Sequence, residues 1–304
     1  MKHDRTSSSS QDKTLLGLGQ ITTAAAFYGS MGMWSVMTMS AFGAFSQGWV
    51  KALIILVIVS AVGISKKQFR RPKKADLKWF ALAAVASLNV VPYFFGFQLL
   101  GASMGTVAFN VGASVAGYIC ARIFFKEKIT LLKILSLVIV LAGIITIYGL
   151  SVDQDILLGG SLMLLTGTMS AFMNVCNKKL GHYSATQQVF WSFFVIFIAC
   201  LLLSFIFNDK VPAISNANWL PWVALIAYAG ANIGSMNFRI ASLRNLNVSI
   251  VVLVGLSEII FGVLFGVIFL GELFSLRTAI GVFVIILGLA LETVLLLIAK
   301  KRKL

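Results

Sequence analysis

The sequence predicts an all-α membrane protein with ten transmembrane helices arranged as two inverted five-helix repeats. Three observations predict this fold: a very apolar composition, long apolar segments separated by short basic ones, and a likeness between the two halves of the chain. Of the 304 residues, 59% are hydrophobic and only 12% are charged, and the mean hydropathy is +0.94. A soluble domain has ~25% charged residues, so a protein that crosses the membrane many times is expected.

Ten segments are apolar and long enough to cross a ~30 Å hydrocarbon layer as helices, which takes ~20 residues each. They are residues 20–41, 46–64, 78–98, 102–121, 130–150, 156–175, 186–207, 219–240, 247–270 and 275–298. An even number of crossings places both termini on the same side of the membrane. The predicted organisation is a disordered cytoplasmic tail at 1–19, a first repeat at 20–150, a second repeat at 151–299 and a basic cytoplasmic tail at 300–304.

The distribution of lysine and arginine supports this topology, because cytoplasmic loops carry an excess of both residues. With the N-terminus inside, 22 of the 25 basic residues fall on the inner side, and the outer side keeps only Lys51, Lys210 and Arg277. The sequence therefore predicts a multi-pass protein of the cell (inner) membrane with both termini cytoplasmic. The formal net charge of +15 is spread over short clusters between apolar stretches, so no nucleic-acid partner is expected.

A shift of 145 positions aligns the two halves. It pairs Glu127 with Glu272, Thr130 with Ser275 and Gly143 with Gly288. Each half holds five predicted helices, an odd number, so the second repeat enters the membrane from the opposite face. Threonine and serine are good N-cap residues and an acid complements the positive end of the following helix, so we expect Glu127 and Glu272 to be structural turn residues that reach water rather than substrate ligands.

Several segments resemble a known family. The stretch VIFLGELFSLRTAIGVFVIILGL (267–289), the basic link at 178–180 and the basic residue Lys51 in the second helix are similar to features of the EamA family of the drug/metabolite transporter superfamily. The resemblance covers residues 20–298 and implies secondary transport of small metabolites, often outward. Family members commonly have Glu-Pro in the ninth helix, where this chain has Glu258-Ile259, so no proline kink is predicted there.

Glu258 lies midway along the ninth predicted helix, where a charge in hydrocarbon costs at least ~2.5 kcal/mol. It should therefore face the bundle interior, either as a proton-coupling group or substrate anchor, or as a carboxyl group that packs against a neighbouring helix. Pro92 predicts a kink that leaves the carbonyl of Leu88 free, and Lys51 is expected to extend toward the interface. Seven more side chains are candidates for substrate binding: Trp34, Asn89, Tyr93, Asn110, Trp191, Tyr228 and Asn232.

These seven side chains have two possible roles. The amides can recognise a neutral polar group or join helices, and the aromatic rings can bind a cation or fill the core. Glu258 and Asn110 are expected at the same midplane region, because the repeat brings helices 4 and 9 together.

The predicted function is that of a secondary active transporter, an exporter by the family resemblance, which works by alternating access around a midplane cavity. Its substrate is expected to be an amino-acid-like, cationic or amphipathic small molecule, and protons are a candidate coupling ion. The chain has no GxxxxGK[ST] motif, its three cysteines lack CxxC spacing and its two histidines lie in a tail and a loop, so no cofactor, catalytic residue or metal site is predicted. An intramembrane enzyme and a non-transporting structural membrane protein are the alternatives, and a monomer and a homodimer are both left open.

Overall fold

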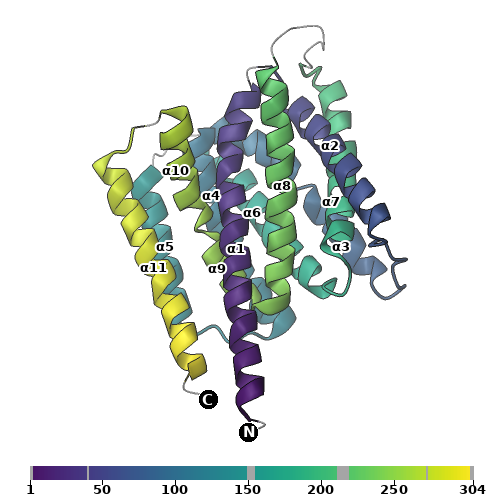
Figure 1. The fold of residues 1–304 in the computed structure, drawn as a ribbon. Coiled ribbons are helices and arrows are strands. Elements are labelled where there is room, and N and C mark those ends of the chain that lie inside the picture. The colour runs from purple at the N-terminus through teal and green to yellow at the C-terminus, as the bar shows by residue number, and fades with distance from the viewer. Residues whose placement is uncertain (1–2, 40, 149–154, 211–218, 272, 302–304) are drawn as a thin grey trace.

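The computed structural model describes residues 3–39, 41–148, 155–210, 219–271 and 273–301, and this part of the chain forms helices and loops without any strand (Figure 1). The helices are α1 (His3–Met39), α2 (Ala44–Ser65), α3 (Leu77–Ser87), α4 (Val90–Phe125), α5 (Leu131–Tyr148), α6 (Asp155–Lys179), α7 (Ala185–Ile206), α8 (Leu220–Asn245), α9 (Val248–Gly255), α10 (Glu258–Leu270) and α11 (Leu276–Lys301).

Six stretches of these helices are long and apolar enough to cross a membrane. They are Ala44–Ser65, Leu77–Gly96, Ala108–Phe125, Leu157–Lys179, Ala185–Ile206 and Val248–Leu270, and two shorter apolar helices cover Leu131–Ile147 and Leu276–Leu291. The predicted spans 20–41 and 219–240 lie in α1 and α8, which carry many Gly, Ser and Asn residues and are less apolar. The all-helical class is confirmed, whereas the number of ten crossings stays a prediction.

The N-terminal segment differs from the expected disordered tail, because α1 begins at His3. Further along α1, residues 17–20 contact the end of α8. A Cβ added at Gly17 would lie 2.7 Å from Leu246, and the Asn245 side-chain amide donates to the Gln20 side-chain oxygen Oε1 at 3.0 Å.

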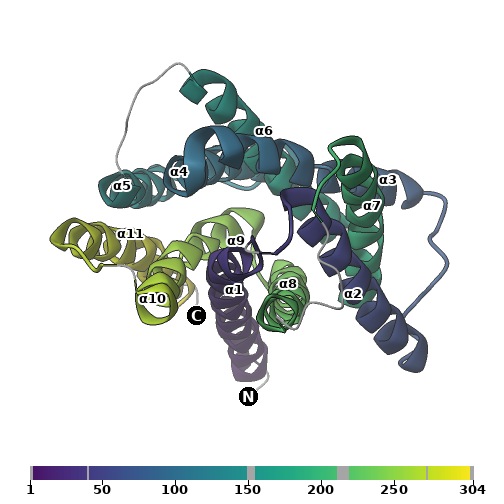
Figure 2. The ribbon, with the colours of Figure 1, turned by 90° about the horizontal axis from the view of Figure 1, so that it is seen from above.

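The two halves of the chain interleave, as the view from above shows (Figure 2). The main helix pairs join one half to the other: α1 with α8 and α10, α2 with α7, α6 with α3 and α4, and α5 with α11. If helix n of the first half corresponds to helix n+5 of the second, with α9 and α10 counted together, each of these pairs maps onto another or onto itself. The contact pattern thus has the two-fold character expected of a repeat.

The pairing of α5 with α11 shows the repeat at the level of single residues. A Cβ added at Gly143 would lie 2.7 Å from Ile285, and one added at Gly288 would lie 2.6 Å from Val140. These two contacts exchange under the 145-residue shift. Gly281 likewise meets Ile147, so the two equivalent helices run antiparallel.

Helix α4 folds back on itself. A straight helix would separate residues 93 and 109 by about 24 Å along its axis, yet the ring centroids of Tyr93 and Phe109 are 6.4 Å apart. Gly96 and Gly112 consequently face neighbouring residues of α6, Met163 and Leu164. One element thus contains parts of two predicted spans, 78–98 and 102–121.

The junction between α3 and α4 is a tight turn rather than an open kink. The carbonyl of Leu88 accepts from Val91 N–H at 3.0 Å, and Asn89 N–H donates to Ala86 at 3.2 Å. The expectation that Pro92 leaves the Leu88 carbonyl free is therefore wrong, because the shorter i to i+3 bond replaces the missing one.

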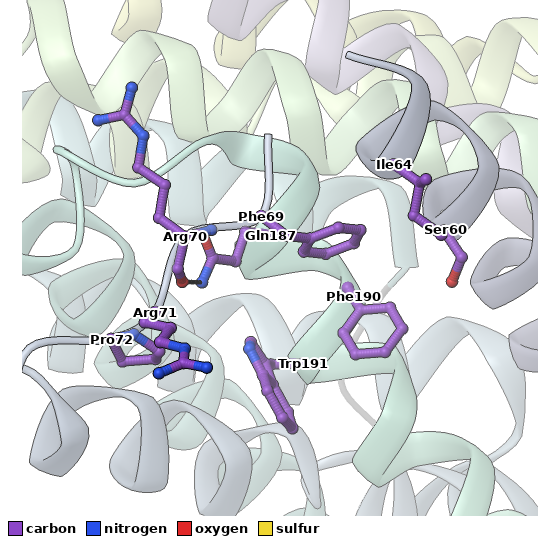
Figure 3. Close-up of a pocket in the computed structure, with 9 residues that line it drawn as sticks. All are labelled: Ser60, Ile64, Phe69, Arg70, Arg71, Pro72, Gln187, Phe190 and Trp191. Atoms are coloured by element: carbon purple, nitrogen blue, oxygen red, sulfur yellow. Dashed lines mark hydrogen bonds between the residues drawn. The ribbon is translucent and has the colours of Figure 1, made fainter. Parts of the chain in front are cut away.

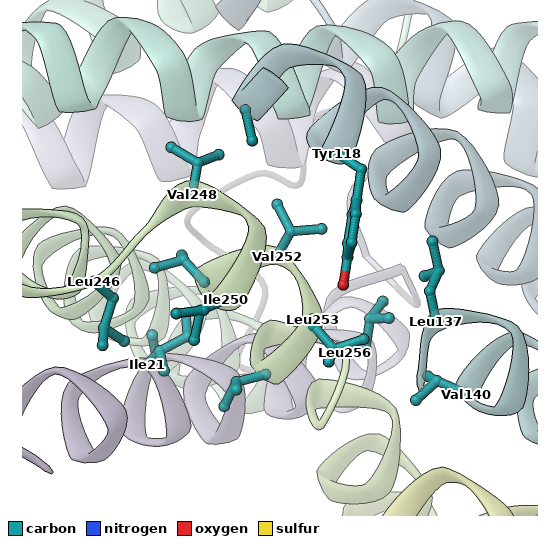
Figure 4. Close-up of a cluster of buried hydrophobic side chains, with 14 of the residues drawn as sticks. Ile21, Tyr118, Leu137, Val140, Leu246, Val248, Ile250, Val252, Leu253 and Leu256 are labelled. Carbon is teal, nitrogen blue, oxygen red and sulfur yellow. The ribbon is translucent and has the colours of Figure 1, made fainter. Parts of the chain in front are cut away.

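The largest apolar cluster surrounds α9. Buried side chains from α1, α4, α5 and α11 belong to the same cluster, among them Ile21, Tyr118 and Ile285, and Figure 4 shows several of the cluster's side chains around the short helix. A Cβ added at Gly117 would lie 2.7 Å from Val252, so α4 and α9 approach closely. This packing fixes the position of the chain just before Glu258.

Candidate functional site

The ninth predicted helix is interrupted in the middle of a candidate span. Helix α9 ends at Gly255 and α10 begins at Glu258, and between them Ser257 N–H donates to Val254 at 3.0 Å while its hydroxyl donates to the same carbonyl at 2.7 Å. No proline kink was predicted here, and the interruption indeed needs no proline, because these i to i+3 bonds tighten the chain. Glu258 thereby becomes the first residue of α10, where the positive end of the helix dipole favours a negative charge.

Helix α1 passes very close to this interruption. A Cβ added at Gly29 would lie 2.6 Å from both the Glu258 carbonyl oxygen and Phe261 Cβ, and 2.7 Å from Gly262 N. Only glycine allows the backbones to approach to this distance. The α1–α10 contact therefore holds the first turn of α10 in place.

Arg239 of α8 is a positive group in the neighbourhood of Glu258. Its guanidinium carbon lies 5.3 Å from the ring centroid of Tyr28, the residue before Gly29 on α1, which approaches the Glu258 backbone. The Nε atom of Arg239 is buried, and no hydrogen-bond acceptor for it exists among the described residues. An unsatisfied buried donor costs about 1–3 kcal/mol, so this atom is a candidate to bind a ligand acceptor.

Lys51 of α2 supplies a second positive group inside the bundle. Its ammonium nitrogen is 3.7 Å from the ring centroid of Tyr228, and the residue is only 9% exposed. The expectation that Lys51 extends toward the interface is wrong, because the tyrosine ring offers a cation–π contact within the protein. One turn earlier, Gln47 accepts from the Thr38 hydroxyl at 2.8 Å, while its Nε2 is buried without a partner in the described chain.

Tyr93 of α4 packs edge-on against Phe94 and Phe109, and Tyr228 and Glu258 both belong to its electrostatic surroundings. The structure therefore brings together three of the predicted residues, Glu258, Tyr93 and Tyr228. With Lys51 and Arg239 they form what we call the central polar cluster.

The remaining predicted residues lie elsewhere or bond locally. The side-chain amides of Asn110 and Asn232 donate to carbonyls of their own helices, Thr106 and Tyr228, at 2.9 Å each. Trp34 and Asn89 are half-buried, and among the described residues neither side chain makes a hydrogen bond or a ring contact. Trp191 is 40% exposed at the start of α7 and lines a peripheral cavity.

Lys51 and Arg239 are not among the substrate-binding residues that the sequence predicts. Arg239 stands at the cytoplasmic end of the predicted span 219–240, whereas α8 continues to Asn245 and so places it further inside the helix. The signal for both was available: each is a basic residue within a helix that is otherwise apolar or neutral for at least a turn on either side.

The predicted turn residue Glu127 is buried and stabilises a different helix from the expected one. It is 8% exposed; its carboxylate accepts from Val248 N–H at 2.8 Å, and from Ser249 N–H and hydroxyl at 3.2 and 2.8 Å. Lys178 Nζ lies 3.8 Å from the same carboxylate. Glu127 thus caps α9 in the other half, because the loop that carries it lies beside the first turn of that helix. Glu272 lies outside the described residues.

At the opposite end of the bundle, an acid of the second half caps a helix of the first half. Asp209, after α7, accepts from the N–H groups of Phe45 and Ser46 at 2.7 and 2.8 Å and so caps α2 in the first half. Each half therefore caps a helix of the other. In the described part of the chain, no group of three His, Cys, Asp or Glu side chains could hold a metal ion.

Comparisons with known proteins agree with the fold. The family model described as "EamA-like transporter family" matches residues 15–149 and again 157–294. An "Uncharacterized transporter" from Helicobacter pylori (strain J99 / ATCC 700824) is 23% identical over 281 residues, which cover 90% of this chain and 92% of the relative. A solved structure described only as "Crystal structure of protein" has a TM-score of 0.78 at 15% identity and covers 94% of this chain and 97% of its own, which is a likeness of fold.

Proposed function

Because this chain belongs to the EamA-like transporter family, we propose that it is a secondary active transporter that carries an amino-acid-like zwitterion across the membrane. The family match and the relative named as a transporter support transport. The substrate class rests on one arrangement: an acid, two cations and two tyrosine rings lie in the same region of the bundle interior, with Lys51 over the ring of Tyr228. A zwitterion complements such a site, since Lys51 or Arg239 can bind a carboxylate and Glu258 an ammonium group.

Alternating access is the mechanism that this arrangement favours. The cluster draws on α2, α4, α8 and α10, which belong to both halves, so a relative movement of the halves would open it to one side at a time. Glu258, the first residue of α10, is a candidate proton-coupling group, which would release a proton when the substrate binds and take one up when the substrate leaves. Outward transport is the direction that the family resemblance favours.

The proposed topology has ten crossings and both termini on the cytoplasmic side of the inner membrane. The antiparallel α5 and α11 and the reversal within α4 support it, as does the position of most lysines and arginines. Reporter fusions after residues 70, 180 and 304 should all report the cytoplasm, and a fusion after Lys210 should report the outside. An outside signal at 304 would contradict the even number of crossings.

Transport by the purified chain in liposomes tests the substrate class. We expect uptake of radiolabelled amino acids under a pH gradient, and we expect Glu258→Gln and Lys51→Met each to reduce it at least about 100-fold, the effect of losing about 2.7 kcal/mol of a buried charged interaction. Lys66→Gln, which removes an exposed charge from a loop, is the matched control and should transport normally. Uptake of amines by the wild type without any amino-acid uptake would contradict the zwitterion, as would full activity of Lys51→Met.

A further inference from the structure

A second site lies far from the central polar cluster, at the basic end of α2 and α7. A cavity of about 430 Å³ is lined by Ser60 and Ile64 of α2, by residues 69–72 of the next loop, and by Gln187, Phe190 and Trp191 of α7 (Figure 3). The candidate spans end at Ser65 and begin at Ala185. The cavity therefore straddles the boundary of two spans, with apolar side chains within the spans and arginines just beyond them.

The loop that forms the cavity is held in place. The Gln187 side chain pairs with the Arg70 backbone, accepting from its N–H at 3.1 Å and donating to its carbonyl at 2.7 Å. Phe69 packs edge-on against Phe190 with ring centroids 5.3 Å apart, and its ring lies over Gly63, where an added Cβ would be only 2.2 Å away. The site is thus built by the fold.

The loop also carries uncompensated positive charge. Residues 66–78 contain seven Lys and Arg residues and a single acid, Asp76, which already accepts from Tyr183 and contacts His182. Arg70 and Arg71 are exposed, and among the described residues neither forms an ion pair. Figure 3 shows the Arg71 guanidinium on the Trp191 side of the cavity, whereas the Arg70 guanidinium points away.

The rim and the surfaces above it are apolar and exposed. Ile64 is 71% exposed and Trp191 is 40% exposed, and the outer faces of the two helices continue with Val57, Val62, Phe194 and Ile198, which are also exposed. A free phosphate would use only the arginines. A ligand with an anionic head and a long apolar part would use both regions.

We propose that this cavity binds the headgroup of an anionic phospholipid, with its phosphate at Arg71 beside the Trp191 ring and its acyl chains along α2 and α7. Basic pockets at the cytoplasmic ends of transmembrane helices suit such headgroups, and indole rings favour the interfacial level of the bilayer. The inference does not depend on the transported substrate.

Native mass spectrometry of the full chain in detergent tests the proposal by titration with phosphatidylglycerol and, separately, phosphatidylcholine. We expect the wild type to prefer phosphatidylglycerol, and Arg71→Gln to lower that affinity about five-fold, which corresponds to about 1 kcal/mol for a basic group at an anionic surface. Trp191→Ala should weaken binding as well. Lys66→Gln is the matched control, because it removes the same charge from the same loop outside the cavity, and it should bind like the wild type.

Three outcomes would overturn the site. Equal affinity for the two lipids would exclude headgroup recognition, and an equal loss in Lys66→Gln and Arg71→Gln would indicate a diffuse charge effect of the loop. Displacement of the lipid by inorganic phosphate or by an acidic peptide at equal concentration would show an anion or peptide site without any acyl contribution. Thermal unfolding of each variant confirms that the loss of lipid binding is not a loss of folding.

Discussion

At the residue scale, the buried charges divide into those with complete hydrogen bonding and those without. Glu127 accepts three hydrogen bonds and has Lys178 beside it, which is the pattern of a structural group. Arg239 keeps a buried Nε that lacks an acceptor in the described chain, and Lys51 rests on an aromatic ring. Incomplete bonding at the central polar cluster is what a site for a polar ligand requires, because the ligand supplies the missing partners.

The substitution Glu127→Gln tests whether this acid stabilises the fold. The amide keeps the size of the side chain but loses the negative charge that faces the positive end of α9, so we expect the free energy of unfolding to fall by about 1–3 kcal/mol. Thermal unfolding in detergent measures the loss, and Lys128→Gln in the same loop is the control. Unchanged stability with a selective loss of substrate affinity would instead place Glu127 in the transport site.

Part of the cluster could be predicted from single residues. Glu258, Tyr93 and Tyr228 are polar groups within apolar segments, and the cost of exposing such groups to lipid predicts that they face the interior. Lys51 was misjudged, because the sequence does not show which face of α2 turns toward Tyr228. The role of Glu127 was also beyond the sequence, since its partners lie about 120 residues away in the chain.

At the scale of elements, the positions of the helices follow from the lengths of apolar segments, but their interruptions do not. The break before Glu258 has no proline, and α1 passes close to it at Gly29. The reversal within α4 was expected only as a boundary between two spans. Both features involve contacts between helices, which local propensity does not encode.

Gly29→Ala tests how tightly α1 controls the start of α10. The added methyl group would meet the Glu258 carbonyl, so the helices must separate, and we expect a loss of about 1–3 kcal/mol in stability together with reduced transport. Gly32→Ala on the same helix has no atom within 4 Å of the added Cβ and should be neutral or stabilising by up to about 1 kcal/mol. Equal effects of the two substitutions would mean that helix propensity, and not the α1–α10 contact, is responsible.

The loop between α2 and α3 is held by a pH-sensitive contact between Asp76 and residues 182 and 183. His182 Nε2 lies 3.0 Å from the Asp76 carboxylate, and the Tyr183 hydroxyl donates to the same carboxylate at 2.9 Å. These two hydrogen bonds, with a smaller contribution from the charge of Lys73, lower the pKa of Asp76 from its ordinary value of 3.8. A lowered pKa in the folded state means that the stabilisation is present above about pH 4 and is lost as the pH falls through the folded pKa. Asp76→Asn should therefore lower the melting temperature near neutral pH, and the difference from the wild type should vanish in acid. A difference that stays constant with pH would show that charge on Asp76 does not matter.

At the scale of the whole molecule, the two halves are held together by reciprocal contacts. Glu127 and Asp209 each cap a helix of the other half, and α5 and α11 cross at glycines that exchange under the repeat. The sequence predicted the register of 145 residues correctly at this crossing, because close helix packing demands a small residue at each equivalent position.

Gly143→Ala and Gly288→Ala test this crossing as a symmetric pair. Each added methyl group pushes α5 and α11 apart, because it meets the other helix of the pair, at Ile285 of α11 in one case and at Val140 of α5 in the other. We therefore expect similar losses of about 1–3 kcal/mol. Because either substitution separates the same two helices, the double variant should lose less than the sum of the single losses. Gly230→Ala on α8, with open space around the added Cβ, is the control in thermal unfolding. Fully additive losses would show that the two glycines act at independent contacts and that the halves do not meet there as a unit.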